Sequence, residues 1–371
     1  MRYFIVAGEA SGDMHGAKLM SAILAQDAQA SFNYWGGDLM AQTAPGLIQH
    51  YKENAIMGFV EVVANLHKIS KNLSNCKKAI LAFKPDVVIL IDYPGFNLRI
   101  AKFSKLNGFK TAYYIAPKVW AWKENRAKIL EKYVDLLLLI FPFETSYFKK
   151  WKVNSVYIGN PLATSISSFK SSHTSLAEKP IIALLPGSRK QELKRMLPTM
   201  VALSQYFKTH QFIVCGAPGL EQSDYLPYLN AHVQITFNQT YDILSKAEAA
   251  IVCSGTASLE TAFFNVPQLC AYKANAVSLR IAKLFVKVKY MSLVNLCLNR
   301  EAIPELLQEE FNLETLQSQL KNILIGGNQR NQMLTDYNEL NNLFTESAPT
   351  QKAATAIIGL TRSTLNSNPK Y

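Results

Sequence analysis

An acidic residue follows each of two short apolar runs in the first half of the sequence. Asp92 comes directly after residues 87–91, and Glu9 is one glycine beyond residues 3–7. Such runs are typical of buried parallel strands, whose carboxyl ends face the ligand crevice of an α/β sheet. Partial burial at that edge raises the pKa of a carboxyl group toward the range that suits a general base. Asp92 is therefore a candidate catalytic base, and an Asx-turn acid is the alternative.

The loop around Glu9 reads GEASGD over residues 8–13. It lacks the G-x-G-x-x-G spacing of a dinucleotide site, and its two carboxylates would repel a pyrophosphate. Sugar hydroxyls or proton transfer suit this loop better. Ser11, Gly12 and Asp13 are thus candidates for binding a sugar acceptor. A helix start capped by Ser11 or Asp13 is the alternative.

Two further groups near predicted strand ends could contact a sugar. Asn97 lies in the turn that begins at Asp92, and its amide can donate or accept a hydrogen bond. Trp120 lies in residues 115–126, where aromatic rings alternate with cationic side chains. Such a cluster can cover a sugar ring or hold a phosphate. Packing between domains is the alternative for Trp120.

Two glycine-containing loops in the second half are candidates for binding a nucleotide diphosphate. One follows the apolar residues 181–185, and the other follows residues 249–253 and opens a helix. Backbone amides at a helix start attract phosphate oxygens, and small residues allow close approach. The candidates are Gly187, Ser188 and Arg189 in the first loop, and Gly255, Thr256, Ser258 and Glu260 in the second. A plain capped helix start is the alternative for the second loop.

No pattern in the sequence indicates a bound metal. The six histidines are scattered, and neither H-x-x-x-H nor D-x-D occurs. The five cysteines form no C-x-x-C, which fits a reducing compartment;. We therefore expect Arg189 and helix N-termini, rather than a metal ion, to stabilise the leaving group.

A basic amphipathic stretch over residues 56–78 could contact a membrane. The chain has a net charge of +12, which favours an anionic partner, and no arginine-rich tract or zinc-finger spacing points to nucleic acid;. No apolar run is long enough for a membrane span. The stretch either packs on the core or lies in a lipid interface. Its candidate membrane-contacting residues are Met57, Phe59, Val60, Val63 and Leu66.

The elements that must position these residues form two α/β halves. Short apolar runs alternate with longer helical patterns in each half, which is typical of parallel sheets with crossover helices. We predict one Rossmann-like domain over residues 1–165 and another over 178–345, separated by a Ser/Thr-rich linker. A C-terminal helix and tail over 346–371 packs on its own domain, crosses to the first, or swaps into a partner. Two such domains enclose a cleft, as in GT-B glycosyltransferases and a family of sugar-nucleotide epimerases.

Motifs along nearly the whole chain together resemble those of the lipid-A-disaccharide synthases. The most specific set is GEASGD at 8–13, VWAW at 119–122 and SGTASLE at 254–260. Further matching motifs are MGFVEV at 57–62, DYPGFN at 92–97, PGSR at 186–189, VPQ at 266–268, KVKYMSLVN at 287–295 and PELLQEE at 304–310. Any one of these motifs alone would be a weak signal.

The resemblance implies a GT-B fold and an inverting sugar transfer between two lipids. The donor would be UDP-2,3-diacylglucosamine, and the acceptor would be 2,3-diacylglucosamine 1-phosphate (lipid X). The products would be a β-1',6-linked disaccharide 1-phosphate and UDP. The resemblance implies no cofactor, membrane contact through residues 57–73, and a place on the cytoplasmic face of the inner membrane of a Gram-negative-type bacterium. It leaves a homodimer open.

The resemblance also implies roles for single residues. Asp92 matches the general base, and Glu9 lies in the acceptor-side motif, where it positions the acceptor or tunes Asp92. Contacts to UDP carry over to Arg189, Glu260, Asn295 and Gln308, and an acceptor-side contact carries over to Asn160. The sequence departs from the family pattern at Ala116, where serine is usual, at Asn160, where histidine is often found, and at Gly95, which replaces an acid of some members.

Two other functions fit the same architecture. A UDP-sugar epimerase would act on a soluble substrate, and a lipid- or nucleotide-binding protein would need neither Glu9 nor Asp92. A nicotinamide-dependent oxidoreductase is disfavoured because the glycine fingerprint is absent.

Overall fold

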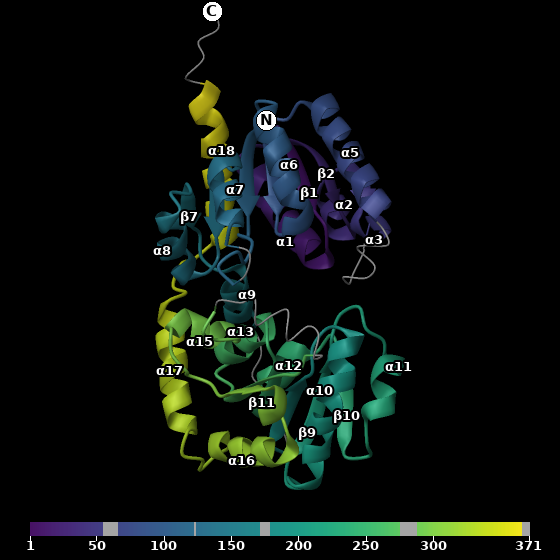
Figure 1. Cartoon of the computed structure of the whole chain (residues 1–371), viewed down its shortest axis with the longest axis vertical. Helices are drawn as coiled ribbons and strands as arrows, with labels where there is room; N and C mark the ends of the chain where they lie inside the picture. Colours follow the sequence, from purple (N-terminus) through teal and green to yellow (C-terminus); the bar gives the residue numbers. More distant parts are fainter. Residues whose placement is uncertain (55–65, 122–123, 171–178, 275–287, 366–371) are drawn as a thin grey trace, which may run out of the picture. The chain divides into compact units, whose positions relative to one another are not determined.

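The computed structural model describes residues 1–54, 66–121, 124–170, 179–274 and 288–365 (Figure 1). The chain divides into two compact units. Unit 1 comprises Met1–Pro161 together with Glu346–Tyr371, and unit 2 comprises Leu162–Thr345. Each unit is built on one parallel sheet with helices around it. The prediction of two Rossmann-like α/β domains is therefore confirmed.

Unit 1 contains a seven-stranded sheet with the order β3-β2-β1-β4-β5-β6-β7. The central strand β4 (Val87–Ile91, VVILI) is buried along its full length, as expected for an apolar strand between two helix layers;. The order reverses between β1 and β4, and ligands of open α/β sheets bind at such a reversal. The other strands are β1 (Arg2–Ala7), β2 (Ser31–Gly36), β3 (Leu47–His50), β5 (Lys110–Tyr114), β6 (Leu136–Leu139) and β7 (Ser155–Tyr157).

Alternating side chains of β1 pack into two different helix layers. Tyr3 and Ile5 pack with residues of α1 and α18, whereas Phe4 and Val6 pack with residues of α5, α6 and α7. This period of two is what a strand buried on both faces requires. The helices of unit 1 are α1 (Ala10–Leu24), α2 (Asp38–Thr43), α3 (Tyr51–Asn54), α5 (Leu66–Phe83), α6 (Pro94–Leu106), α7 (Arg126–Tyr133), α8 (Pro142–Lys150) and α18 (Pro349–Leu365).

The C-terminal helix α18 packs on unit 1, although unit 2 precedes it in the sequence. Ala353, Ala354 and Ile357 are fully buried in the cluster that contains α1. Thr355 Oγ1 donates a hydrogen bond to Gln26 Oε1 at 2.8 Å, just beyond the end of α1. Figure 1 shows this helix, in yellow, beside the N-terminal unit. The sequence leaves three placements of the C-terminal helix open. In the structure, α18 crosses to the first domain.

Unit 2 contains a six-stranded parallel sheet with the order β10-β9-β8-β11-β12-β13. Its order reverses between β8 and β11, so unit 2 repeats the plan of unit 1. Its strands are β8 (Ile181–Leu185), β9 (Gln211–Gly216), β10 (Val233–Phe237), β11 (Ala247–Cys253), β12 (Gln268–Tyr272) and β13 (Glu305–Leu307). Its α-helices are α10 (Lys190–Ala202), α11 (Gln222–Tyr225), α12 (Thr240–Leu244), α13 (Thr256–Phe263), α15 (Leu293–Leu298), α16 (Leu313–Ile323) and α17 (Arg330–Asn342).

The Ser/Thr-rich stretch predicted as a linker begins with a helix, α9 (Pro161–Lys170). Phe169 lies edge-on to the rings of Tyr241 and Phe264, with centroids 5.6 and 5.9 Å away. These contacts attach α9 to unit 2. Within the described part of the chain, no helix has the length and apolar character needed to cross a membrane.

Candidate functional site

The first candidate site lies where β1, β4 and β5 end side by side. The last paired residues of these strands are Ala7, Ile91 and Tyr114. Asp92 therefore lies at the same edge as residues 8–13 and residues 115–121, which follow the neighbouring strands. The structure thus brings three of the predicted acceptor-side segments together at the reversal point of the unit 1 sheet.

The turn that carries Asp92 has a strained backbone. Asp92 and Tyr93 have φ angles of 42° and 49°, in the left-handed region that residues with side chains rarely adopt;. The carbonyl of Asp92 accepts hydrogen bonds from the Tyr113 hydroxyl at 2.6 Å and from Asn97 Nδ2 at 2.8 Å, and these bonds hold the turn. Strain that the surroundings maintain is concentrated at functional sites.

Asn97 has a structural position, and its expected contact with an acceptor stays a prediction. Its side chain is fully buried, and Nδ2 also donates to the Ile91 carbonyl at 3.1 Å. Asn97 therefore supports Asp92 through the backbone of the turn.

Two charges of opposite sign act on the carboxyl group of Asp92. Asp92 is an exposed residue at the strand end, but closely packed protein atoms desolvate its carboxyl group and raise its pKa. The cation of Lys118 lowers the pKa of Asp92, and the carboxylate of Glu9 raises it. Asp92 is thus an accessible carboxyl group with a raised pKa, which is the property that a general base needs.

The loop that carries Glu9 divides into exposed and buried parts. Glu9 and Ser11 are exposed, whereas Gly12 packs against Ala7 and Asp13 is only 3% exposed. The Asp13 carboxylate accepts backbone N–H groups of Gly37, Leu39 and Met40 at 2.7 to 3.1 Å and so caps α2;. These bonds favour the alternative prediction for Asp13, a helix-capping acid, over contact with an acceptor. The capped helix is α2, whereas the sequence suggested the helix that follows the loop, α1.

Trp120 is fixed by a buried carboxyl group. Its Nε1–H donates to Glu144 Oε1 at 3.0 Å, and its ring lies edge-on to Phe143 with centroids 4.9 Å apart. Glu144 also accepts the N–H groups of Ile140 and Phe141 at 3.3 and 3.1 Å. Burial raises the pKa of Glu144 to about 7, against the opposing effect of these hydrogen bonds. Glu144 thereby anchors the loop that carries Lys118.

Asn160 follows β7 and lies at the end of unit 1. It is 4% exposed, and Gly159 before it has a φ of 90°. A side chain at Gly159 would clash with Glu346, since an added Cβ would lie 2.7 Å from Cβ of Glu346. The predicted acceptor contact of Asn160 stays a prediction.

The second candidate site lies at the reversal point of unit 2. β8 and β11 pair as far as Leu185 and Val252, so residues 186–189 and residues 254–258 follow at one edge. Ser254 Oγ donates to the carbonyl of Met291 at 2.8 Å and links this edge to the segment before α15. The two glycine-containing loops predicted to bind a diphosphate are therefore neighbours.

An internal carboxylate occupies the first of these loops. Glu192 Oε2 accepts the N–H groups of Ser188 at 2.9 Å and Arg189 at 3.2 Å, and Arg189 Nη1 donates to Glu192 Oε1 at 3.3 Å. Gly187 has a φ of 108°, and any side chain there would clash with Glu192. The loop thus binds an anion in this structure, and that anion belongs to the protein. The Arg189 side chain itself is 76% exposed.

The second loop presents the start of α13. Gly255 has a φ of 142°. Among the described residues, no atom lies within 4 Å of an added Cβ at this position, and no side chain caps the helix. Thr256 is exposed, whereas Ser258 is buried and donates to the Gly255 carbonyl at 2.8 Å. Glu260 accepts a hydrogen bond from the Tyr241 hydroxyl at 2.9 Å, and burial raises its pKa. The exposed helix start suits a phosphate, and Ser258 serves the turn.

The side-chain amide of Asn295, for which a contact with UDP was expected, makes hydrogen bonds within the protein through both its nitrogen and its oxygen. Its Nδ2 donates to Ile303 and Glu305, both at 2.9 Å, and its Oδ1 accepts the N–H groups of Ala302 and Ile303. The side chain is fully buried. Gln308 differs, because it is half-buried just after β13 with a φ of 56°. Its contact with UDP stays a prediction.

Some predictions fall on residues that the structure does not describe. Met57, Phe59, Val60 and Val63 lie outside the described residues, and only the backbone of Leu66 is described, at the start of α5. Among the residues that are described, no group of His, Cys, Asp and Glu side chains could hold a metal ion.

Sequence reasoning missed the two carboxyl groups that shape the loops, Glu144 and Glu192. Both lie at the third position of a helix, three residues after its N-cap. This spacing is the capping-box pattern, in which the acid bonds back to the start of the helix. The pattern could have identified their hydrogen bonds, but not the ring of Trp120 as a partner.

Comparisons with known proteins bear on the family and on the fold of the chain. A family model described as lipid-A-disaccharide synthetase matches residues 3–358. The lipid-A-disaccharide synthase of Myxococcus xanthus is 32% identical over 97% of this chain and 97% of its own. The solved glycosyltransferase of kitacinnamycin has a TM-score of 0.65 at 12% identity, covering 97% of this chain and 99% of its own. The Neisseria meningitidis UDP-GlcNAc 2-epimerase bound to UDP-GlcNAc has a TM-score of 0.62 at 11% identity, covering 99% and 100%.

The structural likeness shows the GT-B fold, and the sequence matches select one family among the proteins that share it. The resemblance seen in the sequence motifs is confirmed by the family model and by the similar relatives. The chain belongs to the lipid-A-disaccharide synthase family and is a glycosyltransferase of lipid A biosynthesis.

Proposed function

We propose that this protein transfers 2,3-diacylglucosamine from UDP-2,3-diacylglucosamine to 2,3-diacylglucosamine 1-phosphate, with inversion at the anomeric carbon. The observation that carries the proposal is Asp92. It is an accessible carboxyl group at the reversal point of the sheet, on a strained turn, with a pKa raised by desolvation. A base of this kind is what activation of a sugar hydroxyl requires.

The proposed reaction is a single in-line displacement. The acceptor's 6-hydroxyl oxygen attacks the anomeric carbon of the donor while Asp92 takes the hydroxyl proton. The bond from the anomeric carbon to the diphosphate oxygen breaks, and UDP leaves with the electron pair. Arg189 and the amides near Gly255 and Thr256 stabilise the charge on the leaving UDP. This step uses neither a metal nor a cofactor.

Four further residues are assigned proposed binding roles. Glu9 and Ser11 are exposed beside Asp92 and would contact acceptor hydroxyls. Glu260 and Gln308 would contact the nucleoside. For Glu260, this requires the Tyr241 hydroxyl to share or yield its hydrogen bond.

We also propose that the reaction takes place on the cytoplasmic face of the inner membrane, because both lipids carry acyl chains. The net charge of +12 supports attraction to anionic lipid;. The amphipathic residues 57–66 are the proposed contact on sequence grounds alone, and homodimer formation stays a prediction.

The test is a radiolabelled transfer assay in mixed micelles with EDTA. Wild-type protein should convert UDP-2,3-diacylglucosamine and lipid X into a disaccharide 1-phosphate and UDP. Asp92→Asn should reduce kcat by about 10²- to 10⁴-fold, which is the usual contribution of a general base. Asp86→Asn makes the same change just before the opposite end of β4 and serves as the matched control. Near-normal turnover by Asp92→Asn with unchanged UDP binding would refute the assignment of the base.

A further inference from the structure

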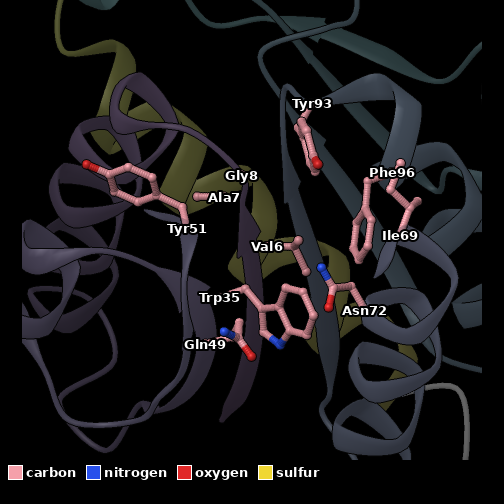
Figure 2. Close-up of a pocket in the computed structure, with 10 residues that line it drawn as sticks. All are labelled: Val6, Ala7, Gly8, Trp35, Gln49, Tyr51, Ile69, Asn72, Tyr93 and Phe96. Atoms are coloured by element: carbon pink, nitrogen blue, oxygen red, sulfur yellow. The ribbon is translucent and has the colours of Figure 1, made fainter. Parts of the chain in front are cut away.

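The pocket beside the Asp92 turn in unit 1 is too small to select a nucleotide (Figure 2). Its volume is about 20 Å³, which admits about one water molecule;. None of the described residues that line it carries a charge. The polar groups that could select a nucleotide are those at the ligand edge of unit 2, among them Glu260.

The carboxyl group of Glu260 has one oxygen in use and one that can accept a ligand. Oε1 accepts the Tyr241 hydroxyl at 2.9 Å, and no group of the described residues donates a hydrogen bond to Oε2. Burial raises the pKa of Glu260, the hydrogen bond from Tyr241 lowers it, and no cation among the described residues adds to this lowering. A carboxylate in such a place binds neutral O–H donors and repels phosphate. The hydroxyl groups of a ribose are such donors.

The ring of Tyr241 is held by two aromatic side chains from outside its own helix. Tyr241 lies in the first turn of α12, and its ring centroid is 5.3 Å from that of Phe264, which directly follows α13. Phe169 of α9 lies edge-on to both rings, at 5.6 and 5.9 Å. Burial and the Glu260 carboxylate raise the pKa of Tyr241, so its hydroxyl keeps the proton and remains a donor. The three rings therefore fix the direction of the hydrogen bond to Glu260.

We propose that Tyr241 is a positioning residue that holds Oε1 of Glu260, so that Oε2 accepts a hydrogen bond from a ribose hydroxyl of the donor nucleotide. The inference rests on the proposed function, which assigns Glu260 to the nucleoside. A carboxylate with one fixed oxygen needs little further ordering when the ligand binds, so its hydrogen bond contributes more to affinity. An analogue without the hydroxyl leaves this oxygen unpaired, and the site thereby distinguishes ribose from deoxyribose.

Calorimetry with UDP, 2'-deoxy-UDP and 3'-deoxy-UDP tests the proposal without requiring turnover. Wild-type protein should bind UDP at least about 10-fold more tightly than one of the deoxy analogues, as for a hydrogen bond to a charged group. Tyr241→Phe removes the O–H donor and keeps the ring, and it should reduce this preference about 3- to 10-fold. Tyr206→Phe makes the same change at an exposed tyrosine near the amino end of β9 and should leave the preference unchanged. Equal weakening of UDP and both analogues by Tyr241→Phe would indicate a purely structural role and overturn the proposal.

Glu260→Ala shows whether Tyr241 acts through Glu260. This variant should lose most of the preference, and adding Tyr241→Phe should not change what remains. A further loss in the double variant overturns the proposal, because Tyr241 would then act on the ribose by itself. If wild-type protein binds UDP with no preference over either analogue, the inference fails while the proposed transfer stands. If the preference depends on Tyr241 but wild-type protein makes no disaccharide, the proposed function fails while the role of Tyr241 stands.

Discussion

At the scale of single residues, the pKa of Asp92 depends on two neighbours with opposite charges. Lys118 stabilises the carboxylate, whereas Glu9 disfavours it. Removing the cation by Lys118→Gln should therefore raise the pKa of Asp92 and move the acid limb of kcat/KM to higher pH. Glu9→Gln should lower that pKa and move the acid limb to lower pH. Shifts of both variants in the same direction would contradict this account, and Lys128→Gln on the exposed side of α7 is the control.

Glu144 makes the stability of unit 1 depend on pH. Burial raises its folded-state pKa from 4.5 to about 7. Between these values the folded protein keeps a proton that the unfolded chain has lost, so the free energy of unfolding falls as pH rises. The loss approaches roughly 3 kcal/mol above pH 7. Tm measured from pH 4 to 8 should fall more steeply in the wild type than in Glu144→Gln, and the exposed Glu131→Gln should follow the wild type. Equal slopes in all three proteins would exclude Glu144 as the cause.

Sequence reasoning identified residues whose side chains could take part in catalysis or binding. It could not distinguish side chains that are free to contact a ligand from side chains that stabilise loops of the protein. Asp92 and Arg189 are accessible at strand ends, as predicted. Asp13, Asn97 and Asn295 are used instead by backbone groups of the protein. The partners of Asp13 lie 24 to 27 residues away along the chain, and only the folded structure brings them to its carboxylate. A single motif such as GEASGD therefore contains both exposed side chains and side chains that stabilise the fold.

At the scale of elements, the loop between β8 and α10 already holds an anion. Glu192 accepts the N–H groups of Ser188 and Arg189, which a UDP diphosphate would also need. Glu192→Gln removes a competing negative charge, so the Kd for UDP measured by calorimetry should fall about 3- to 10-fold. Loss of the helix cap should cost about 1 kcal/mol of stability. Glu314→Gln changes an acid in the first turn of α16 and should leave UDP binding unchanged.

If Glu192→Gln instead weakens UDP binding, Glu192 would be a group that organises the loop for the diphosphate. The two outcomes differ in sign, so one titration separates them. Measurement of Tm for the same samples shows whether either result arises from partial unfolding.

The positions of strands were predictable, whereas the shapes of the loops at their ends were not. Continuous apolar runs such as residues 87–91 and 181–185 form the central strands as expected;. The left-handed backbone at Asp92 and Tyr93 has only a weak sequence signal, because aspartate tolerates this region but tyrosine rarely adopts it;. The helix α9 was hidden by its serine and threonine content, and Phe169 attaches it to unit 2 through aromatic contacts that only the fold creates.

At the scale of the whole molecule, each unit has a reversal of strand order that marks its ligand edge. The candidate base is at this edge in unit 1, and the candidate diphosphate loops are at this edge in unit 2. This division was predictable, because each half of the sequence repeats the strand and helix pattern. The placement of α18 was not predictable, since an amphipathic helix fits an apolar groove on either domain.

The packing of α18 predicts that a C-terminal substitution destabilises the N-terminal unit. Ile357 is fully buried against the β1 face that carries α1, so Ile357→Ala should cost about 2–5 kcal/mol;. Hydrogen–deuterium exchange should then increase in β1 and α1, about 340 residues away in sequence, and not in β11 or β12. Leu316→Ala in α16 removes an equally buried side chain from unit 2 and should give the reverse pattern. Faster exchange in unit 2 alone after Ile357→Ala would mean that α18 does not stabilise unit 1 in solution.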